Sequence, residues 1–162
     1  MWNPGFDFEE VQLARIYGLH RAPCIYSWVH RGTKERPGIV LGLAKGGTCI
    51  GKAFKVSSAN RQDALAYLRA RELVTNVYLE RIRTIALASG ETVQAVTYIA
   101  DSKHEQYAGR LSHEALIAQI RGAVGKSGDN ESYILDTTDH LRELGIRDGL
   151  MERISQGLTR HS

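Results

Sequence analysis

Glu72 is the residue of this sequence whose position best suits acid–base chemistry. In the stretch ALAYLRARELVTN, residues 64–76, the spacing of Leu65, Leu68 and Glu72 is i, i+3, i+7, which places all three on one face of a helix. A carboxylate on an apolar face is sheltered from water and can act as a general acid or base. The ordinary alternative is a helix-end carboxylate that pairs with Arg69 or Arg71, and spacing alone leaves both open.

Other chemistry-bearing side chains form weaker patterns. The six histidines are not spaced as zinc ligands, and no GxSxG elbow for a serine nucleophile occurs. Cys24 and Cys49 lie in apolar strand patterns, where thiols are usually inert. The run GAVGKSGDN ends like a phosphate-binding loop, but Ile120 stands where that loop needs a glycine, and a helical pattern precedes it. The sequence predicts no metal, cofactor or nucleotide site.

Strand patterns dominate the first hundred residues. Between residues 11 and 30 the β-branched and aromatic residues predict a strand, a kink and a second strand, because Gly18 and Pro23 interrupt the pattern. Two hairpins are expected after it. Their turns are marked by Gly46 and Gly47 in the first hairpin and by Gly90 in the second.

Helical patterns provide the remaining elements. Asn60 is a plausible N-cap for a helix that ends near Leu73 and carries Glu72. From Ser112 onward three further helices are expected. Strands first and helices last predict an α+β fold, a small mixed and mostly antiparallel β-barrel or sheet with packed helices, in one domain over residues 1–162.

Composition limits the function classes. The 162 residues are 43% hydrophobic and 24% charged, which is the balance of a globular protein. The net charge of +3 is mild and its Lys and Arg residues are scattered among acids, so no nucleic-acid surface is predicted. No apolar run has the length of a membrane span, the amino terminus resembles no leader, and the two cysteines are isolated. These features predict a cytoplasmic protein without a membrane partner.

Several blocks of the sequence, taken together, resemble the ChaC-type γ-glutamylcyclotransferases. The blocks occur in the family's order and span nearly the whole chain, which makes their combination specific. They are MWNPGFDF at the start, HRGTKERPG at 30–38, GKAFKV at 51–56, YLRAREL at 67–73, QYAG at 106–109 and GKSGDNESYIL at 125–135.

The resemblance implies roles for particular residues. The family's catalytic acid/base is the glutamate of the YLxxRE block, which corresponds to Glu72. Tyr107 and Tyr133 correspond to tyrosines of two further blocks and are expected in the substrate pocket, although a tyrosine in such a place is often only a core-edge residue. Trp2 and Arg31 are the other expected substrate-binding residues, and Arg36 is an alternative to Arg31 for a substrate carboxylate.

The resemblance also implies a substrate and a reaction. The substrate is glutathione, and attack of its glutamyl amine on its own side-chain carbonyl gives 5-oxoproline and Cys-Gly without a metal or redox cofactor. One sheltered carboxylate can take a proton from the amine and give one to the departing nitrogen. The alternatives are a cyclotransferase for other γ-glutamyl peptides and a catalytically silent binding or regulatory protein of the same fold.

One family segment is not matched. Members carry a YGSL segment directly before the position of Met1, at the end of a first strand, where its backbone amides hold the γ-glutamyl group. Two alternatives are open: the start was assigned to an internal methionine, or the chain lacks that strand, in which case an impaired substrate cradle and an open sheet edge are expected. We expect a monomer if this edge is covered, and a dimer or poor solubility if it is not.

Overall fold

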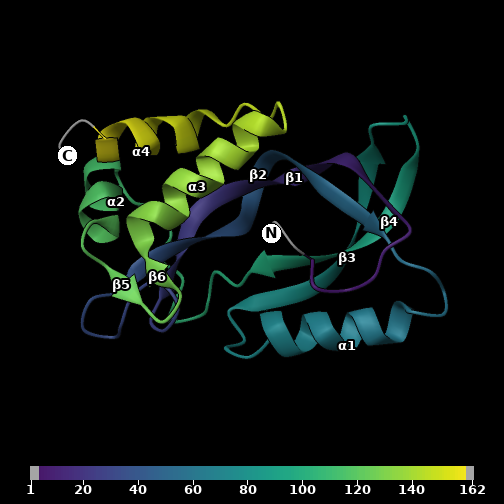
Figure 1. Cartoon of the computed structure of the whole chain (residues 1–162), viewed down its shortest axis with the longest axis horizontal. Helices are drawn as coiled ribbons and strands as arrows, with labels where there is room; N and C mark the ends of the chain where they lie inside the picture. Colours follow the sequence, from purple (N-terminus) through teal and green to yellow (C-terminus); the bar gives the residue numbers. More distant parts are fainter. Residues whose placement is uncertain (1–3, 160–162) are drawn as a thin grey trace. The chain divides into compact units, whose positions relative to one another are not determined.

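The computed structural model of the chain describes residues 4–159 and divides into two compact units (Figure 1). Among the described residues, the first unit comprises residues 4–21 and 43–101, and the second comprises residues 22–42 and 102–159. Two long strands, β1 (Glu10–Ser27) and β2 (Gly38–Lys55), contribute one part to each unit. The single domain expected from the sequence is not tested by this division and stays a prediction.

Four strands, in the order β1, β2, β4 and β3, form a closed barrel. Within the first unit β3 (Tyr78–Leu87) and β4 (Thr92–Ala100) form an antiparallel hairpin, as predicted around Gly90. Strand β1 pairs antiparallel with β3, where Ile16 lies opposite Ile85, and β2 meets β4 in parallel. The predicted α+β class with a small, mostly antiparallel barrel is therefore confirmed.

The core of the first unit is formed by buried side chains of β1, β3 and β4. Ile16, Leu19, Ile85 and Ile99 are all buried and contact one another. Ile16 and Leu19 lie three residues apart on β1 and still reach one cluster, because Gly18 between them has φ +77° and interrupts the strict alternation of the strand. Removing such a side chain from water contributes about 1.5–3 kcal/mol, so the cluster holds the strands that support α1.

Two predicted strand breaks are wrong. Strand β2 runs from Gly38 to Lys55 through Gly46 and Gly47, whose φ angles are +100° and +68°, so no hairpin turn separates two strands there. Strand β1 likewise continues through Gly18, with φ +77°, and through Pro23. Glycine adopts positive φ in turns and also in irregular strand positions, and the sequence pattern does not distinguish the two.

Helix α1 (Arg61–Glu72) confirms the helix expected before residue 73, and it lies beside the β3–β4 hairpin in Figure 1. Asn60 is its N-cap, but the Asn60 side chain makes no capping hydrogen bond. Ala64 is buried, whereas Leu65 and Leu68 are only half-buried. The helix therefore has little buried apolar surface of its own.

The second unit contains the remaining helices, as expected from Ser112 onward. Ser112 and Asp129 are the N-caps of α2 and α3, and their side chains accept hydrogen bonds from backbone amides of the first turns. A short β5–β6 hairpin in the GKSGDN run separates these helices. The bounds are His113–Ile120 for α2, Val124–Gly125 for β5, Gly128–Asp129 for β6, Asn130–Glu143 for α3 and Gly149–Thr159 for α4. Within residues 4–159 no helix has the length and apolarity needed to cross a membrane.

Candidate active site

Glu72 is the last residue of α1, and its carboxylate is sheltered on one side and paired on the other. The side chain is 20% exposed. Its Oε1 accepts a hydrogen bond from Arg71 Nε at 2.9 Å, and Arg71 Nη2 lies 2.8 Å from the same oxygen. At this distance the guanidinium and the carboxylate form a charge-assisted hydrogen bond, which fixes the orientation of the carboxylate. The structure thus combines the two sequence-based interpretations, partial burial and pairing with an arginine.

Arg71 also joins Glu72 to the start of the chain. Its Nη1 donates to the Pro4 carbonyl oxygen at 3.0 Å, and its guanidinium carbon lies 5.4 Å from the centre of the Tyr67 ring. The next residue, Gly5, has φ +77°, and a Cβ atom there would lie 2.1 Å from the Tyr67 hydroxyl oxygen. Only glycine fits this close approach. Pro4 and Gly5 therefore meet the YLRARE block around Arg71.

Arg69, the other arginine considered as a partner for Glu72, binds elsewhere. Its guanidinium forms two hydrogen bonds with the carboxylate of Glu80 on β3, at 2.9 and 2.7 Å. The hydroxyl group of Tyr98 on β4 donates to the same carboxylate at 3.0 Å. Arg69 and Arg71, two residues apart on α1, thus bind two different glutamates, Glu80 and Glu72.

Arg31 and Tyr133, two of the expected substrate-binding residues, lie together in the second unit. The Arg31 guanidinium carbon is 5.2 Å from the centre of the Tyr133 ring, and Arg31 Nη1 donates to the Asp129 carbonyl oxygen at 3.2 Å. The Tyr133 hydroxyl oxygen accepts a hydrogen bond from the Leu41 amide at 3.2 Å. The stacking on the Tyr133 ring and the hydrogen bond to Asp129 of β6 fix the orientation of the Arg31 guanidinium group.

Tyr107 lies in the same unit, beside Cys24. Its backbone forms an isolated antiparallel bridge with Ile25. Burial, and then the nearby Cys24, raise the pKa of the Tyr107 phenol. Burial also raises the pKa of the Cys24 thiol to about 11, although a backbone hydrogen bond at Gly42 lowers it somewhat. A thiol held in its neutral form is a poor nucleophile, which agrees with the inert role expected for Cys24.

Arg36 and Trp2 are the remaining residues that the sequence analysis considered for substrate binding. Arg36 Nη2 donates to the carbonyl oxygens of Ala118 and Arg121 at 3.1 and 2.6 Å, so this arginine binds the C-terminal end of α2. Trp2 lies outside the described residues. Arg31 is therefore the better candidate of the two arginines for a substrate carboxylate.

Asn130 is a residue that the sequence analysis did not single out. It is fully buried at the start of α3, and its amide forms two hydrogen bonds of 2.7 Å, one from the Ile39 amide and one to the Ile39 carbonyl. This pair ties α3 to β2 within the second unit. The only sequence signal was its place in the GKSGDNESYIL block, three residues before Tyr133.

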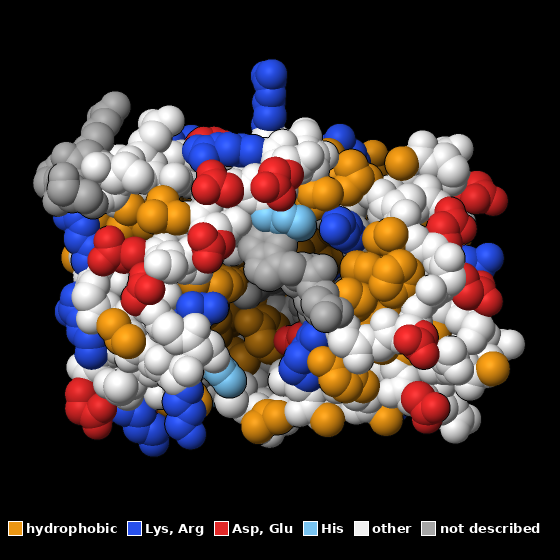
Figure 2. Space-filling view, viewed as in Figure 1, with side chains coloured by type: hydrophobic (Ala, Val, Ile, Leu, Met, Phe, Trp, Pro, Cys, Tyr) orange, Lys and Arg blue, Asp and Glu red, His pale blue; other side chains and the backbone are white. Residues whose placement is uncertain are grey.

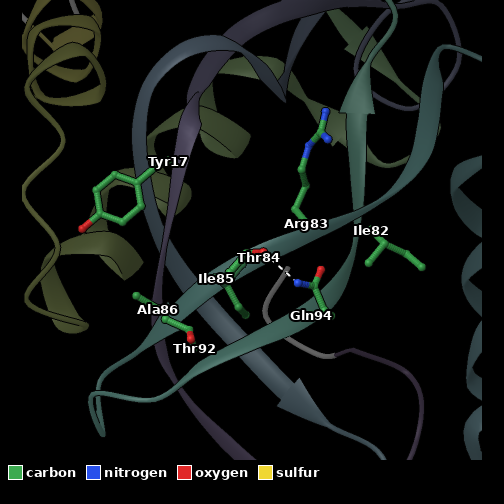
Figure 3. A pocket seen from close by; sticks show the side chains of 8 residues that line it. All are labelled: Tyr17, Ile82, Arg83, Thr84, Ile85, Ala86, Thr92 and Gln94. Carbon is green, nitrogen blue, oxygen red and sulfur yellow. Dashed lines mark hydrogen bonds between the residues drawn. The ribbon is translucent and has the colours of Figure 1, made fainter.

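A surface hollow of about 430 Å³ lies in the first unit (Figure 3). Tyr17 and residues of the β3–β4 hairpin line it, and Thr84 and Gln94 are joined there by a hydrogen bond of 2.8 Å. None of the expected site residues is part of its lining. Acid–base chemistry is better assigned to Glu72 than to this hollow, which is lined by no carboxylate, histidine or cysteine.

Charged side chains of both signs are interspersed on the face shown in Figure 2. Among residues 4–159 no group of three or more His, Cys, Asp or Glu side chains is arranged to hold a metal ion. The arrangement around Glu72 is accordingly one carboxylate with an arginine partner. The carboxylate of such a pair can take a proton from a bound substrate and return it, while the arginine holds the carboxylate in place.

Comparison with known proteins decides the family. A family model described as ChaC-like protein matches residues 1–161. The chain belongs to the ChaC-like family. This ChaC-like chain is 32% identical over 148 residues to an Escherichia coli protein named glutathione-specific gamma-glutamylcyclotransferase, and the match covers 91% of the chain and 64% of that relative. It therefore spans somewhat less than two thirds of the length of the E. coli protein.

Further relatives of the ChaC-like chain carry similar names. A Danio rerio protein named glutathione-specific gamma-glutamylcyclotransferase 1 is 32% identical, and the match covers 88% of the chain and 74% of the relative. A yeast crystal structure, described as a gamma-glutamyl cyclotransferase specific to glutathione, superposes with a TM-score of 0.85 at 18% identity and covers 95% of the chain and 89% of the yeast chain. At that identity the yeast structure supports the fold alone.

Proposed function

We propose that this chain is a glutathione-specific γ-glutamylcyclotransferase in which Glu72 is the catalytic acid/base. Relatives of that name match about nine tenths of the chain. The observation that carries the assignment of Glu72 is its geometry, a carboxylate 20% exposed at the end of α1 and held by Arg71. Its position in the YLRARE block agrees with the family's acid/base.

The proposed reaction is an internal rearrangement of the substrate. The glutamyl amine attacks the side-chain carbonyl carbon, a carbon–nitrogen bond closes the five-membered ring, and the bond to the cysteine nitrogen breaks. Glu72 takes a proton from the attacking amine and returns it to the departing nitrogen, so no water or oxidant is consumed. Because nucleophile and electrophile belong to one molecule, holding the cyclising conformer supplies much of the acceleration.

Arg31, Tyr107, Tyr133 and Trp2 are proposed to bind the substrate. Support for Arg31 comes from its stacking on Tyr133. The stacking holds the Arg31 guanidinium in one orientation, and a guanidinium can bind a carboxylate through two parallel hydrogen bonds. Glutathione has two carboxylates for such a group. Tyr107 and Tyr133 each have a phenol that can add a hydrogen bond.

The cytoplasmic location and the monomeric state, with a dimer through an exposed sheet edge as its alternative, remain part of this proposal. Neither Cys24 nor Cys49 forms a disulfide, which suits a reducing compartment.

Arg71 is expected to act through Glu72. Replacing Arg71 with alanine removes a charge-assisted hydrogen bond to the carboxylate, and kcat for glutathione should fall roughly 10-fold, since each 1.4 kcal/mol is a factor of ten. Arg71→Lys should recover part of this loss because it keeps the charge. Arg61→Ala is the matched control, an exposed arginine at the other end of α1, and should leave kcat unchanged. An Arg71→Ala variant as fast as the wild type would show that the pair has no catalytic role.

The substrate can be tested directly by comparing glutathione with γ-glutamyl-alanine. If the enzyme recognises only the γ-glutamyl half, both compounds should give 5-oxoproline. If Arg31 binds the glycine carboxylate of glutathione, only glutathione should give 5-oxoproline. A glutathione-specific enzyme should show a higher kcat/KM for glutathione. Equal kcat/KM values would replace the proposal with a broader γ-glutamyl cyclotransferase, and binding by calorimetry without product would replace it with a silent binding protein.

A further inference from the structure

The carboxylate of Glu80 connects three secondary-structure elements of the first unit. It accepts two hydrogen bonds from Arg69 on α1 and one from Tyr98 on β4, while Glu80 itself belongs to β3. Glu80 and Tyr98 lie directly opposite each other in the hairpin register. Arg69 precedes Glu72 by three residues, which is almost one helical turn. A single acceptor group thus ties the end of α1 to both strands of the hairpin.

The charges of this cluster support one another. The hydrogen bonds from Arg69 lower the pKa of Glu80, and Glu80 in turn raises the pKa of Arg69. Burial and the Glu80 carboxylate raise the pKa of the Tyr98 phenol to about 12, with a smaller contribution from the charge of Glu72. Tyr98 therefore stays protonated as a donor and lies within electrostatic range of Glu72.

Apart from the contacts of Arg71 and Tyr67 with Pro4, Gly5 and Phe6, helix α1 has little to hold it in place. Only Ala64 is buried among its residues, the Asn60 side chain makes no capping bond, and Leu73 rather than glycine stands at its C-cap. A helix held by so little apolar burial depends on polar contacts for its position. Those contacts lie near the end that carries Glu72.

We propose that Arg69, Glu80 and Tyr98 form a clamp that fixes the last turn of α1 on the β3–β4 hairpin and so positions the Glu72 carboxylate. This inference rests on the proposed function, since it assigns Arg69 and Glu80 as positioning residues for the proposed acid/base. A carboxylate displaced by about 1 Å can lose as much as 10²-fold in rate. The clamp should therefore affect turnover more than it affects the stability of the fold.

The ordinary interpretation is an ion pair that contributes little. The Arg69 side chain is 54% exposed and that of Glu80 is 23% exposed, and exposed pairs usually have small effects on stability. Two features separate this pair from that class: the two-bond geometry, and the third partner on a neighbouring strand. Both restrict the helix to one position on the hairpin.

Charge reversal tests the clamp. Glu80→Arg and Arg69→Glu, made singly, should each lower kcat about 10-fold or more with a much smaller change in KM, and the double variant should regain most of the loss. The matched control is the Arg142–Glu152 pair of α3 and α4, which has the same two-bond geometry at 2.9 and 2.6 Å. Reversing either of its members should leave kcat unchanged. Full activity in the single Arg69 and Glu80 variants, or no recovery in the double variant, would overturn the clamp.

Hydrogen exchange gives a second measurement that does not depend on turnover. Backbone amides of residues 69–73 should exchange faster in each single reversal than in the wild type, and the double variant should return toward the wild-type rate. If the wild-type protein leaves glutathione intact, the proposed function is wrong. The hydrogen-exchange rates still test the clamp in that case, because they do not depend on turnover. Unchanged exchange in Glu80→Arg would overturn the clamp whatever the activity.

Discussion

Replacing Glu72 with glutamine is expected to lower kcat for glutathione by about 10²- to 10⁴-fold, the range that general acid–base catalysis supplies. Glutamine has nearly the same shape and can still accept a hydrogen bond from Arg71, but it cannot take or return a proton at neutral pH. The protein should stay folded, because the carboxylate is only partly buried. Release of 5-oxoproline under saturating glutathione measures the effect.

The control for this variant is Glu143→Gln. Glu143 is the last residue of α3, as Glu72 is of α1, but its side chain is 74% exposed. The same chemical change at a helix end should leave kcat unaltered there. Unchanged turnover in Glu72→Gln would remove Glu72 from the mechanism, and an equal loss in Glu143→Gln would show that the effect is not specific to the site.

Replacing Asn130 with alanine is expected to have the largest effect on stability. The substitution leaves the amide and carbonyl of Ile39 without their partners in a fully buried position. Each buried polar group left unpaired costs about 1–3 kcal/mol, so the free energy of unfolding should fall by roughly 2–6 kcal/mol. That is a large part of the roughly 5–15 kcal/mol of a typical domain, and urea denaturation followed by circular dichroism measures it.

Asn60→Ala is the matched control, because the Asn60 side chain makes no capping bond at the start of α1. Its effect should stay within about 0.5 kcal/mol. Asn130→Asp keeps the acceptor for the Ile39 amide but replaces the donor to the Ile39 carbonyl with a second oxygen, so it too should destabilise the protein. A loss below about 1 kcal/mol in Asn130→Ala would mean that water or a rearranged loop replaces both bonds.

The order of the elements was accessible from the sequence because each depends on local signals. The Asn60–Leu73 helix and the hairpin at Gly90 follow from capping and alternation, and both are present. The interruption expected at Gly46 and Gly47 is absent because positive φ there is accommodated inside β2. Whether a glycine pair ends a strand depends on what the flanking residues pair with, and local sequence does not contain that information.

The candidate site was accessible only in part. The helical spacing placed Glu72 with two leucines, and the family resemblance gave it a role, but neither indicated which arginine would bind it. Arg71 is adjacent in sequence, and adjacent residues do not normally face each other on a helix. Their contact depends on α1 ending at Glu72 and on Pro4 lying within reach of the guanidinium. Long-range contacts of this kind, and the Asn130–Ile39 pair, follow from the tertiary fold.

In the proposed reaction the substrate's own amine closes the ring without water, and the most direct test is the fate of glutathione in ¹⁸O-labelled water. Proton NMR should show 5-oxoproline and Cys-Gly appearing in equal amounts, and mass spectrometry should find no ¹⁸O in the 5-oxoproline, since water takes no part in the bond changes. Free glutamate, or ¹⁸O in the ring carbonyl, would indicate hydrolysis and contradict the cyclisation. Glutathione that stays intact would contradict the proposed activity altogether.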